Sequence, residues 1–212
     1  MAINLTVAAD VIDITRDTPR AEDCFFVDTN VWYWVTYTKA TATGAQAYQT
    51  TNYPRYTQDA LAAGSTIYQS GLSLAELSHL IEKSEREIYA KANGMVNKGS
   101  VTLRPKEFRH NFPTERASVC SEVTAACAQV TTLANSLAVT IDGPTASAFM
   151  ARIPTDAVDG YDLYILESMQ ANGVTQVITD DGDFATIPGI RVFTANRNVI
   201  TAATNQGKLV IR

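Results

Sequence analysis

The sequence predicts an α/β fold of three layers, α/β/α, with a mainly parallel central sheet. Short apolar segments rich in aromatic and β-branched residues alternate with longer helical segments along the whole chain. Neither an internal repeat nor a low-complexity tract interrupts this order. The chain has 212 residues, of which 46% are hydrophobic and 18% are charged, as in ordinary globular proteins. We therefore expect a single domain.

The first half of the chain contains two clear strand candidates and three helices. Residues 24–28 ("CFFVD") lack alternation and predict a short, fully buried strand, and residues 65–70 ("STIYQS") predict a second one. Residues 11–15 ("VIDIT") could add an edge strand, and the polar residues 38–52 predict a loop. The helices are expected at 29–37, capped by Thr29 or Asn30, at 54–64, and at 73–94, where Ser73 and Glu76 suggest a capping box.

The second half continues the alternation after an irregular, basic segment at residues 97–113. A long helix is expected next, with Pro113 near its start, and a later helix should end at Asn172 and Gly173. The remaining elements follow in order: helix 113–137, strand 138–142, helix 143–153, helix 159–173, and strands at 175–180, 190–196 and 208–212.

Charge is unevenly distributed along the chain. The formal net charge is −5, which on its own argues against a nucleic-acid partner. Residues 83–116, however, carry eight Lys or Arg residues against four Glu residues. This segment is either a phosphate-binding face or a solvated helix and loop.

The sequence indicates a cytoplasmic protein. It contains no apolar run long enough to cross a membrane, and its acidic start, "MAINLTVAADVIDITRD", does not resemble a signal peptide. Cys24, Cys120 and Cys127 form no CxxC pair, so we expect buried thiols in a reducing compartment rather than zinc ligands.

Several carboxylates are expected at one edge of the sheet. Asp28 ends the first buried strand, and Asp181 follows the strand at 175–180. Parallel strands bring these ends together, and Glu76 and Asp162 lie in the expected first turns of helices that point to the same edge. Each residue also has a structural interpretation: a helix cap for Asp28, a capping box for Glu76, and a favourable helix dipole for Asp162.

The order and spacing of four segments resembles that of PIN-domain nucleases. These segments are "FVDTNVW", "LSLAELSHLIEK", "DLYILESMQANG" and "VITDDGDF", and the resemblance covers about residues 24–194. It implies an acidic set, both catalytic and metal-binding, at Asp28, Glu76, Asp162 and Asp181, supported by Asn30, Asp159, Thr179 and Asp183. Asp159 and Asp162 are one turn apart, and the distance to the last segment favours Asp162. Relative to the family, the chain has an N-terminal extension at about 1–22 and insertions near 38–52 and 92–112.

The resemblance implies a metal-dependent ribonuclease that uses Mg²⁺ or Mn²⁺ to activate water. It also implies an RNA substrate, a toxin role with an antitoxin protein as partner, and a homodimer. One alternative is a catalytically silent PIN-fold module that binds nucleic acid or protein. A phosphotransfer domain with Asp28 as nucleophile fits poorly, because position 30 is Asn rather than Asp. The aromatic residues 32–34 could stack on bases, although at least one of them should be core.

Overall fold

The computed structural model describes residues 4–212 and is built around a six-stranded, all-parallel sheet. The strand order is β1 (Asp10–Asp13), β8 (Arg191–Thr194), β7 (Gln176–Ile178), β2 (Cys24–Val27), β3 (Thr66–Ser70) and β6 (Asn135–Leu137). The predicted α/β fold and the edge strand near the N-terminus are therefore confirmed. Residues 1–3 of the expected N-terminal extension lie outside the described part of the chain.

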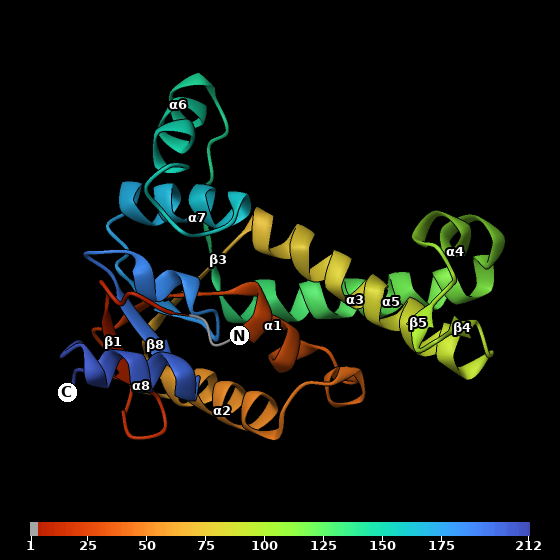
Figure 1. The fold of residues 1–212 in the computed structure, drawn as a ribbon, viewed down its shortest axis with the longest axis horizontal. Coiled ribbons are helices and arrows are strands. Elements are labelled where there is room, and N and C mark those ends of the chain that lie inside the picture. The colour runs from red at the N-terminus through yellow and green to blue at the C-terminus, as the bar shows by residue number, and fades with distance from the viewer. Residues whose placement is uncertain (1–3) are drawn as a thin grey trace.

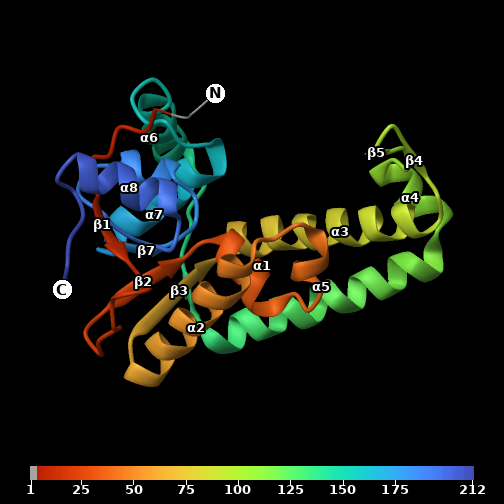
Figure 2. The same ribbon diagram turned by 60° about the horizontal axis from the view of Figure 1, so that its bottom comes forward.

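Alternating side chains of the strands supply two hydrophobic cores. Phe25, Val27 and Phe193 point to one face, where α1 (Thr29–Thr36), α2 (Ala47–Ala63), α3 (Gly71–Ala92) and α5 (Pro113–Leu133) cover the sheet. Phe26 and Val177 point to the other face, against α7 (Gly160–Ala171) and α8 (Arg197–Asn205). Figure 2 shows these two groups of helices on opposite sides of the strands. This is the expected arrangement for a parallel sheet buried on both faces.

Helices α3 and α5 extend beyond the sheet as a long arm (Figures 1 and 2). The outer end carries a hairpin of β4 (Val96–Asn97) and β5 (Ser100–Val101), followed by α4 (Pro105–Asn111). A small core of Ala90, Leu103, Phe108 and Val119 holds this end together. The expected irregular segment is therefore folded, because Pro105 at a helix start and the burial of Phe108 stabilise α4.

Two helices begin at residues other than those predicted. Helix α2 begins at Ala47, within the expected loop, after a short 3-10 turn at Ala40–Thr43 and a cap at Gln46. Helix α3 begins at Gly71, and the Ser70 hydroxyl accepts a hydrogen bond from the Ser73 backbone N–H at 3.1 Å. The predicted capping box of Ser73 and Glu76 is therefore wrong, and Glu76 lies in the second turn of α3.

Strand β6 also differs from its prediction. It occupies Asn135–Leu137, a stretch that the sequence pattern assigned to the preceding helix, and it pairs with β3 through Tyr68 and Asn135. Residues 208–212 contribute only a single bridge, between Leu209 and Val11. Both errors arise because short strands are selected by long-range pairing that local patterns do not encode.

The cysteines are less buried than predicted. Cys24 and Cys120 are exposed, and Cys127 is half-buried. Cys24 is the first residue of β2, where the strand has not yet entered the core, so only the following three residues of "CFFV" are buried. Within residues 4–212, no helix is both long and apolar enough to cross a membrane.

Candidate acidic site at the carboxyl edge of the sheet

Asp28 leaves β2 at the edge where the parallel strands end. Its backbone N–H donates to the Ile178 carbonyl at 3.0 Å, so it continues the pairing of β2 with β7. Its carboxylate accepts from the Thr29 backbone N–H at 2.6 Å, from Asn30 Nδ2 at 2.6 Å and from Thr179 Oγ1 at 2.5 Å. Asp28 is thus the N-cap of α1, and it is also a buried carboxylate held in a fixed orientation.

Asn30 and Thr179 tie the loop after β7 to the start of α1. Asn30 Nδ2 donates to Thr179 Oγ1 at 3.3 Å, and Thr179 Oγ1 accepts from the Asp181 backbone N–H at 2.9 Å. The Asp181 Oδ1 atom in turn accepts from the Asp183 backbone N–H at 2.9 Å. The structure therefore joins the predicted supporting residues Asn30, Thr179 and Asp183 to the same network as Asp28 and Asp181.

The start of α7 brings two further carboxylates to this edge. Asp159 is the N-cap, and its Oδ1 atom accepts from the backbone N–H groups of Tyr161 at 2.9 Å and of Asp162 at 3.1 Å. Asp159 is exposed, whereas Asp162 is buried in the first turn of the helix. Asp159 therefore positions the turn from which the buried Asp162 carboxyl projects.

Burial and neighbouring charge disfavour ionisation of Asp28. Burial raises the pKa of Asp28 to about 7, although the hydrogen bond from Thr179 limits the rise. The charges of Asp181 and Glu76 add to the increase. The Asp28 carboxyl is therefore partly protonated near neutral pH.

Asp162 is affected more strongly. Burial raises the pKa of Asp162 to about 9, and the charges of the surrounding carboxylates contribute to the shift: Asp28, Asp159, Asp181 and Glu76. The pKa of Asp183 is also raised, by burial and then by the charges of Asp181 and Asp159. The six predicted carboxylates thus form one set of mutually repelling neighbours, as expected when carboxyl groups share a site.

These carboxylates do not yet form a complete ligand set. Among residues 4–212, no three Asp, Glu, His or Cys side chains are arranged so that they could hold a metal ion as they stand. The chemistry of the donors nevertheless suits a hard divalent cation, because they are carboxylate oxygens whose repulsion such an ion would relieve.

Asp180 faces away from this cluster, although it adjoins Asp181. Its carboxylate accepts from Tyr53 Oη at 2.6 Å, from Gln49 Nε2 at 2.7 Å and from Tyr48 Oη at 3.0 Å. The pKa of Tyr48 rises to about 12 through burial and the adjacent Asp180 charge. The sequence pattern did not predict this role, because the partners come from α2, more than 120 residues away in the chain.

The prediction that at least one of the aromatic residues 32–34 is core is confirmed. Trp32 and Tyr33 are buried in the core and are unavailable for stacking on a ligand. Tyr161, by contrast, is 60% exposed beside Asp162. The sequence analysis missed Tyr161, although its place between two acidic helix-start residues was visible in "DGYD".

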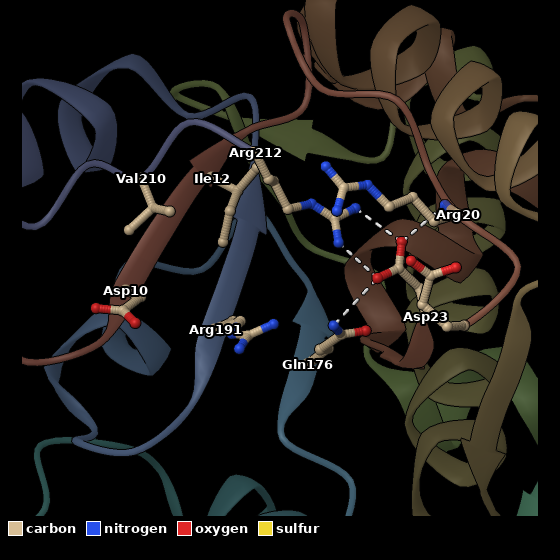
Figure 3. Close-up of a pocket in the computed structure, with 9 residues that line it drawn as sticks. Asp10, Ile12, Arg20, Asp23, Gln176, Arg191, Val210 and Arg212 are labelled. Carbon is tan, nitrogen blue, oxygen red and sulfur yellow. Dashed lines mark hydrogen bonds and ion pairs between the residues drawn. The ribbon is translucent and has the colours of Figure 1, made fainter.

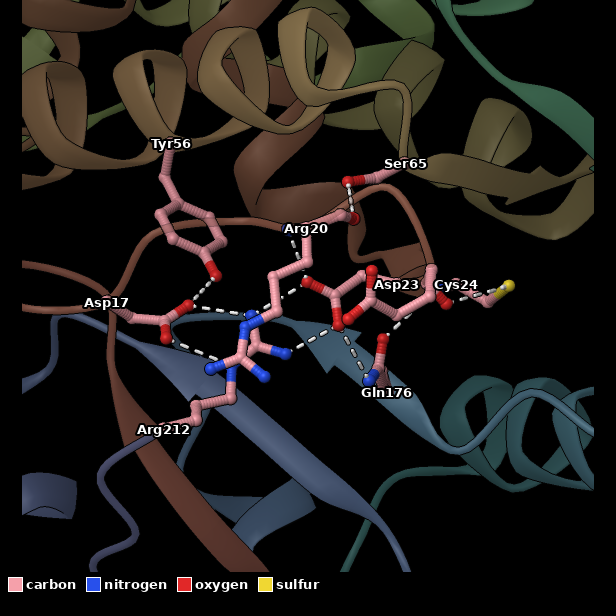
Figure 4. Close-up of polar contacts among 9 residues, drawn as sticks. Asp17, Arg20, Asp23, Cys24, Tyr56, Ser65, Gln176 and Arg212 are labelled. Atoms are coloured by element: carbon pink, nitrogen blue, oxygen red, sulfur yellow. Dashed lines mark hydrogen bonds and ion pairs between the residues drawn. The ribbon is translucent and has the colours of Figure 1, made fainter.

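A second polar cluster lies at the opposite edge, where the strands begin. Arg212 makes paired contacts with Asp17 and Asp23, including 2.8 Å from Nη2 to Asp17 Oδ2 and 2.7 Å from Nη2 to Asp23 Oδ2 (Figure 4). The Arg212 guanidinium carbon also lies 4.6 Å from the centre of the Phe193 ring. Tyr56 donates a hydrogen bond to Asp17.

This cluster borders a hollow of about 390 Å³. Figure 3 shows Arg212 and Gln176 directed toward Asp23 within it. Burial alone would raise the pKa of Asp23, but the hydrogen bonds from Arg212, the Arg20 backbone and Gln176, together with the Arg212 charge, outweigh it and the pKa is lowered. Acidic and basic side chains therefore neutralise one another here, as expected for a cluster that stabilises the fold.

The basic segment at 83–116 forms the outer part of the arm, remote from α7 in both views (Figures 1 and 2). Part of its positive charge is neutralised internally: Arg109 and Arg116 contact the buried Glu82 at 2.6 Å and 2.9 Å. Arg86 donates to the Leu103 carbonyl at 2.6 Å. These three arginines therefore stabilise the arm.

Comparisons of this chain with protein-family models, curated proteins and solved structures gave no match.

Proposed function

We propose that this protein is a metal-dependent endoribonuclease with a PIN-like site at the carboxyl edge of its sheet. The observation that carries the proposal is the gathering of Asp28, Glu76, Asp162 and Asp181 at this edge, where burial first and the neighbouring carboxylate charges second raise the pKa values of Asp28 and Asp162. Strongly shifted carboxyl groups that cluster at the ligand-binding edge of a parallel sheet are typical of functional sites. The order of the four PIN-like segments agrees with this choice of residues.

The four carboxylates are the residues that would hold Mg²⁺ or Mn²⁺. Such a cation, when bound, supplies positive charge for the phosphodiester and lowers the pKa of a water nucleophile. Asn30 and Thr179 orient the Asp28 carboxylate through their hydrogen bonds, and Asp159 orients the start of α7. Asp28 and Asp162 would release protons as the cation binds, so the affinity for the cation should increase with pH.

The open arrangement of the carboxylates favours a second candidate function. Because no three of the described acidic side chains already form a cation site, a catalytically silent module that binds nucleic acid or protein is the alternative. A cytoplasmic toxin role, an antitoxin partner and a homodimer extend the first proposal, and their support is the resemblance of the four segments to PIN-domain nucleases.

The proposal is tested by incubating structured and unstructured RNA with the purified protein in Mg²⁺, in Mn²⁺ and in EDTA. Asp28→Asn should lower metal-dependent cleavage by about 100-fold or more, because several kcal/mol of transition-state stabilisation depend on a correctly held cation. Asp180→Asn is the matched control, since Asp180 lies between Thr179 and Asp181 in the chain but its carboxylate contacts α2 instead. It should retain cleavage within about fivefold.

Two results would contradict the nuclease proposal. Cleavage that persists in Asp28→Asn would remove Asp28 from the site. The absence of cleavage by a folded wild-type protein under every metal condition, together with measurable RNA binding, would favour the silent module. Circular dichroism of both variants separates a loss of chemistry from a loss of fold.

A further inference from the structure

A hollow of about 450 Å³ lies between α6 (Gly143–Arg152) and the start of α7, within the size range of small-ligand sites. Figure 1 shows α6 stacked on α7, outside the sheet. Arg152 of α6 joins the two helices through a 2.7 Å contact from its Nη1 atom to Glu167 Oε1. The lining is mainly apolar and aromatic: Leu72, Ile141, Phe149, Asp159, Gly160, Tyr161 and Tyr164.

The aromatic rings of this hollow are ordered by contacts between the two helices. Phe149 and Tyr164 stack with ring centres 4.7 Å apart and planes at 10°. The Phe149 ring lies against the first turn of α7, with two ring carbons at ordinary contact distances of 3.6 and 3.7 Å from the place where a Cβ atom of residue 160 would stand. Tyr161 differs from these rings, because 60% of it is exposed. Tyr161 is thus an aromatic surface open to a ligand.

Exposed apolar side chains are concentrated in the segment 141–161, of which Ile141 and Tyr161 line this hollow. Among the described residues, most large hydrophobic side chains with high exposure lie between positions 141 and 161: Ile141 at 62%, Met150 at 61%, Ile153 at 55% and Tyr161 at 60%. A cluster of exposed apolar groups on a folded protein marks a binding surface more often than a scattered set does.

The hollow shares Asp159 with the acidic set. Asp159 lines the hollow, and the same carboxylate caps the turn that carries Tyr161 and Asp162. The exposed ring and the buried carboxyl therefore belong to successive residues held by one cap. A phosphate entering the hollow itself would meet the exposed Asp159 carboxylate and be repelled, whereas an uncharged planar group would not.

We propose that this hollow binds an unpaired nucleobase of the RNA substrate, which stacks on Tyr161 while the neighbouring phosphodiester lies over the acidic site. The inference rests on the proposed function and adds to it a base-binding subsite formed by Tyr161 and the hollow between α6 and α7. Aromatic side chains bind bases of any identity through their faces, and single-stranded regions present bases that are free to leave the stack. A paired base in a duplex could not enter.

The test uses the full chain and a short single-stranded oligoribonucleotide that contains 2-aminopurine, whose fluorescence falls when the base stacks. Titrations in Mg²⁺ and in EDTA compare the wild type with three variants. Tyr161→Ala should raise the dissociation constant by roughly 5- to 100-fold, the range expected for loss of one base-stacking contact. Tyr161→Phe should change it less than about twofold, because the phenyl ring still stacks. Val96→Ala is the control, since Val96 is an exposed apolar residue of β4 at the outer end of the arm, outside the lining of the hollow, and it should leave binding unchanged.

The outcomes separate this inference from the nuclease proposal. Cleavage by the wild type with unaltered binding and quenching in Tyr161→Ala would overturn the base-binding inference and leave the nuclease standing. Quenching that depends on Tyr161 in a protein that cleaves no RNA would support the base site and overturn the nuclease. Duplex and single-stranded RNA bound equally well would overturn the inference. So would a self-association, measured by sedimentation, that is lost in Tyr161→Ala while RNA binding is unchanged, because the surface would then join two copies of the chain.

Discussion

The two edges of the sheet bury carboxylates in opposite electrostatic settings. At the amino edge, the side chains of Asp17 and Asp23 are each only 3% exposed, and Arg212 contacts both. At the carboxyl edge, Asp28 and Asp162 are also buried, and Asp28 accepts its hydrogen bonds from an amide, a hydroxyl and a backbone N–H. The pKa of Asp23 is lowered, while the pKa values of Asp28 and Asp162 are raised.

The difference shows that burial alone does not determine the state of a carboxyl group. Desolvation raises the pKa at both edges, and the sign of the final shift depends on whether the chain supplies a cation. At the amino edge, Arg212 supplies it through a planar, bidentate guanidinium. At the carboxyl edge no side-chain cation of the described residues contacts Asp28, so protons or a cation from solution balance the charge of the carboxylates.

Removing the cation of the amino edge should produce the largest change in stability. Arg212→Ala leaves Asp17 and Asp23 buried without their ion pairs, so we expect the free energy of unfolding to fall by about 3 kcal/mol in urea titrations. Arg212→Lys is the control, because it keeps the charge but loses the bidentate geometry, and it should lie between the wild type and Arg212→Ala. A loss below about 1 kcal/mol in Arg212→Ala would show that the cluster contributes little.

Supplying a cation to the carboxyl edge should produce a stabilisation of nearly the same size. Mg²⁺ at 100 times its dissociation constant should increase the free energy of unfolding by about 2.7 kcal/mol, measured as a rise in the melting temperature. Asp28→Asn should remove most of this rise, whereas Arg212→Ala should retain it. An equal response to Mg²⁺ in the wild type and Asp28→Asn would place the ion elsewhere.

Without metal, the two edges should respond to pH in opposite directions. The pKa of Asp28 is about 7 and that of Asp162 about 9 in the folded chain, against about 3.9 for an unfolded Asp. The folded chain therefore holds more protons than the unfolded chain between about pH 4 and pH 9. Stability should fall as pH rises through this window, by up to about 1.4 kcal/mol per pH unit for each proton.

The lowered pKa of Asp23 acts in the other direction: its contribution is present above the unfolded pKa and is lost as pH falls through the folded pKa. Urea titrations in EDTA should thus show maximal stability in mildly acidic solution. Asp28→Asn should flatten the decline between about pH 4 and pH 7, and a wild-type stability that rises between pH 5 and pH 8 would contradict the assigned shifts.

An exposed ion pair provides the smallest expected effect and a baseline for the comparison. Arg55 and Asp59 are 3.6 Å apart on α2, with 81% and 52% of their side chains exposed. Because solvent screens such pairs, Arg55→Ala should change the free energy of unfolding by less than about 0.5 kcal/mol. A larger change would indicate that arginine truncation perturbs this protein in general, and the Arg212→Ala result would then need that correction.

The sequence predicts the fold class and the meeting of the carboxylates because both depend on local patterns and on one rule of topology. Asp28 follows a buried strand, Asp181 follows another, and parallel pairing brings both to one edge. Asp162 is likewise in the first turn of α7, as the pattern of its helix predicts. Metal binding and catalysis at this edge stay predictions.

Features that depend on distant contacts were not predictable in the same way. The Asp180 carboxylate contacts α2 because three side chains of that helix donate hydrogen bonds to it. Arg212 pairs with Asp17 and Asp23, which lie near the other end of the chain. Strand β6 begins at Asn135 because β3 pairs with it there. In each case the partner, rather than the local sequence, determines the outcome.

The contacts of Asp180 with α2 also determine whether the neighbouring loop becomes ordered on folding or on ligand binding. Three donors from one helix hold this side chain, and Thr179 holds the backbone of the next residue, Asp181. The conformational entropy of this loop is therefore lost when the chain folds and not when a ligand reaches Asp181. A ligand at this loop encounters a surface that is already ordered, so its association is limited by desolvation and charge rather than by the search of a flexible segment.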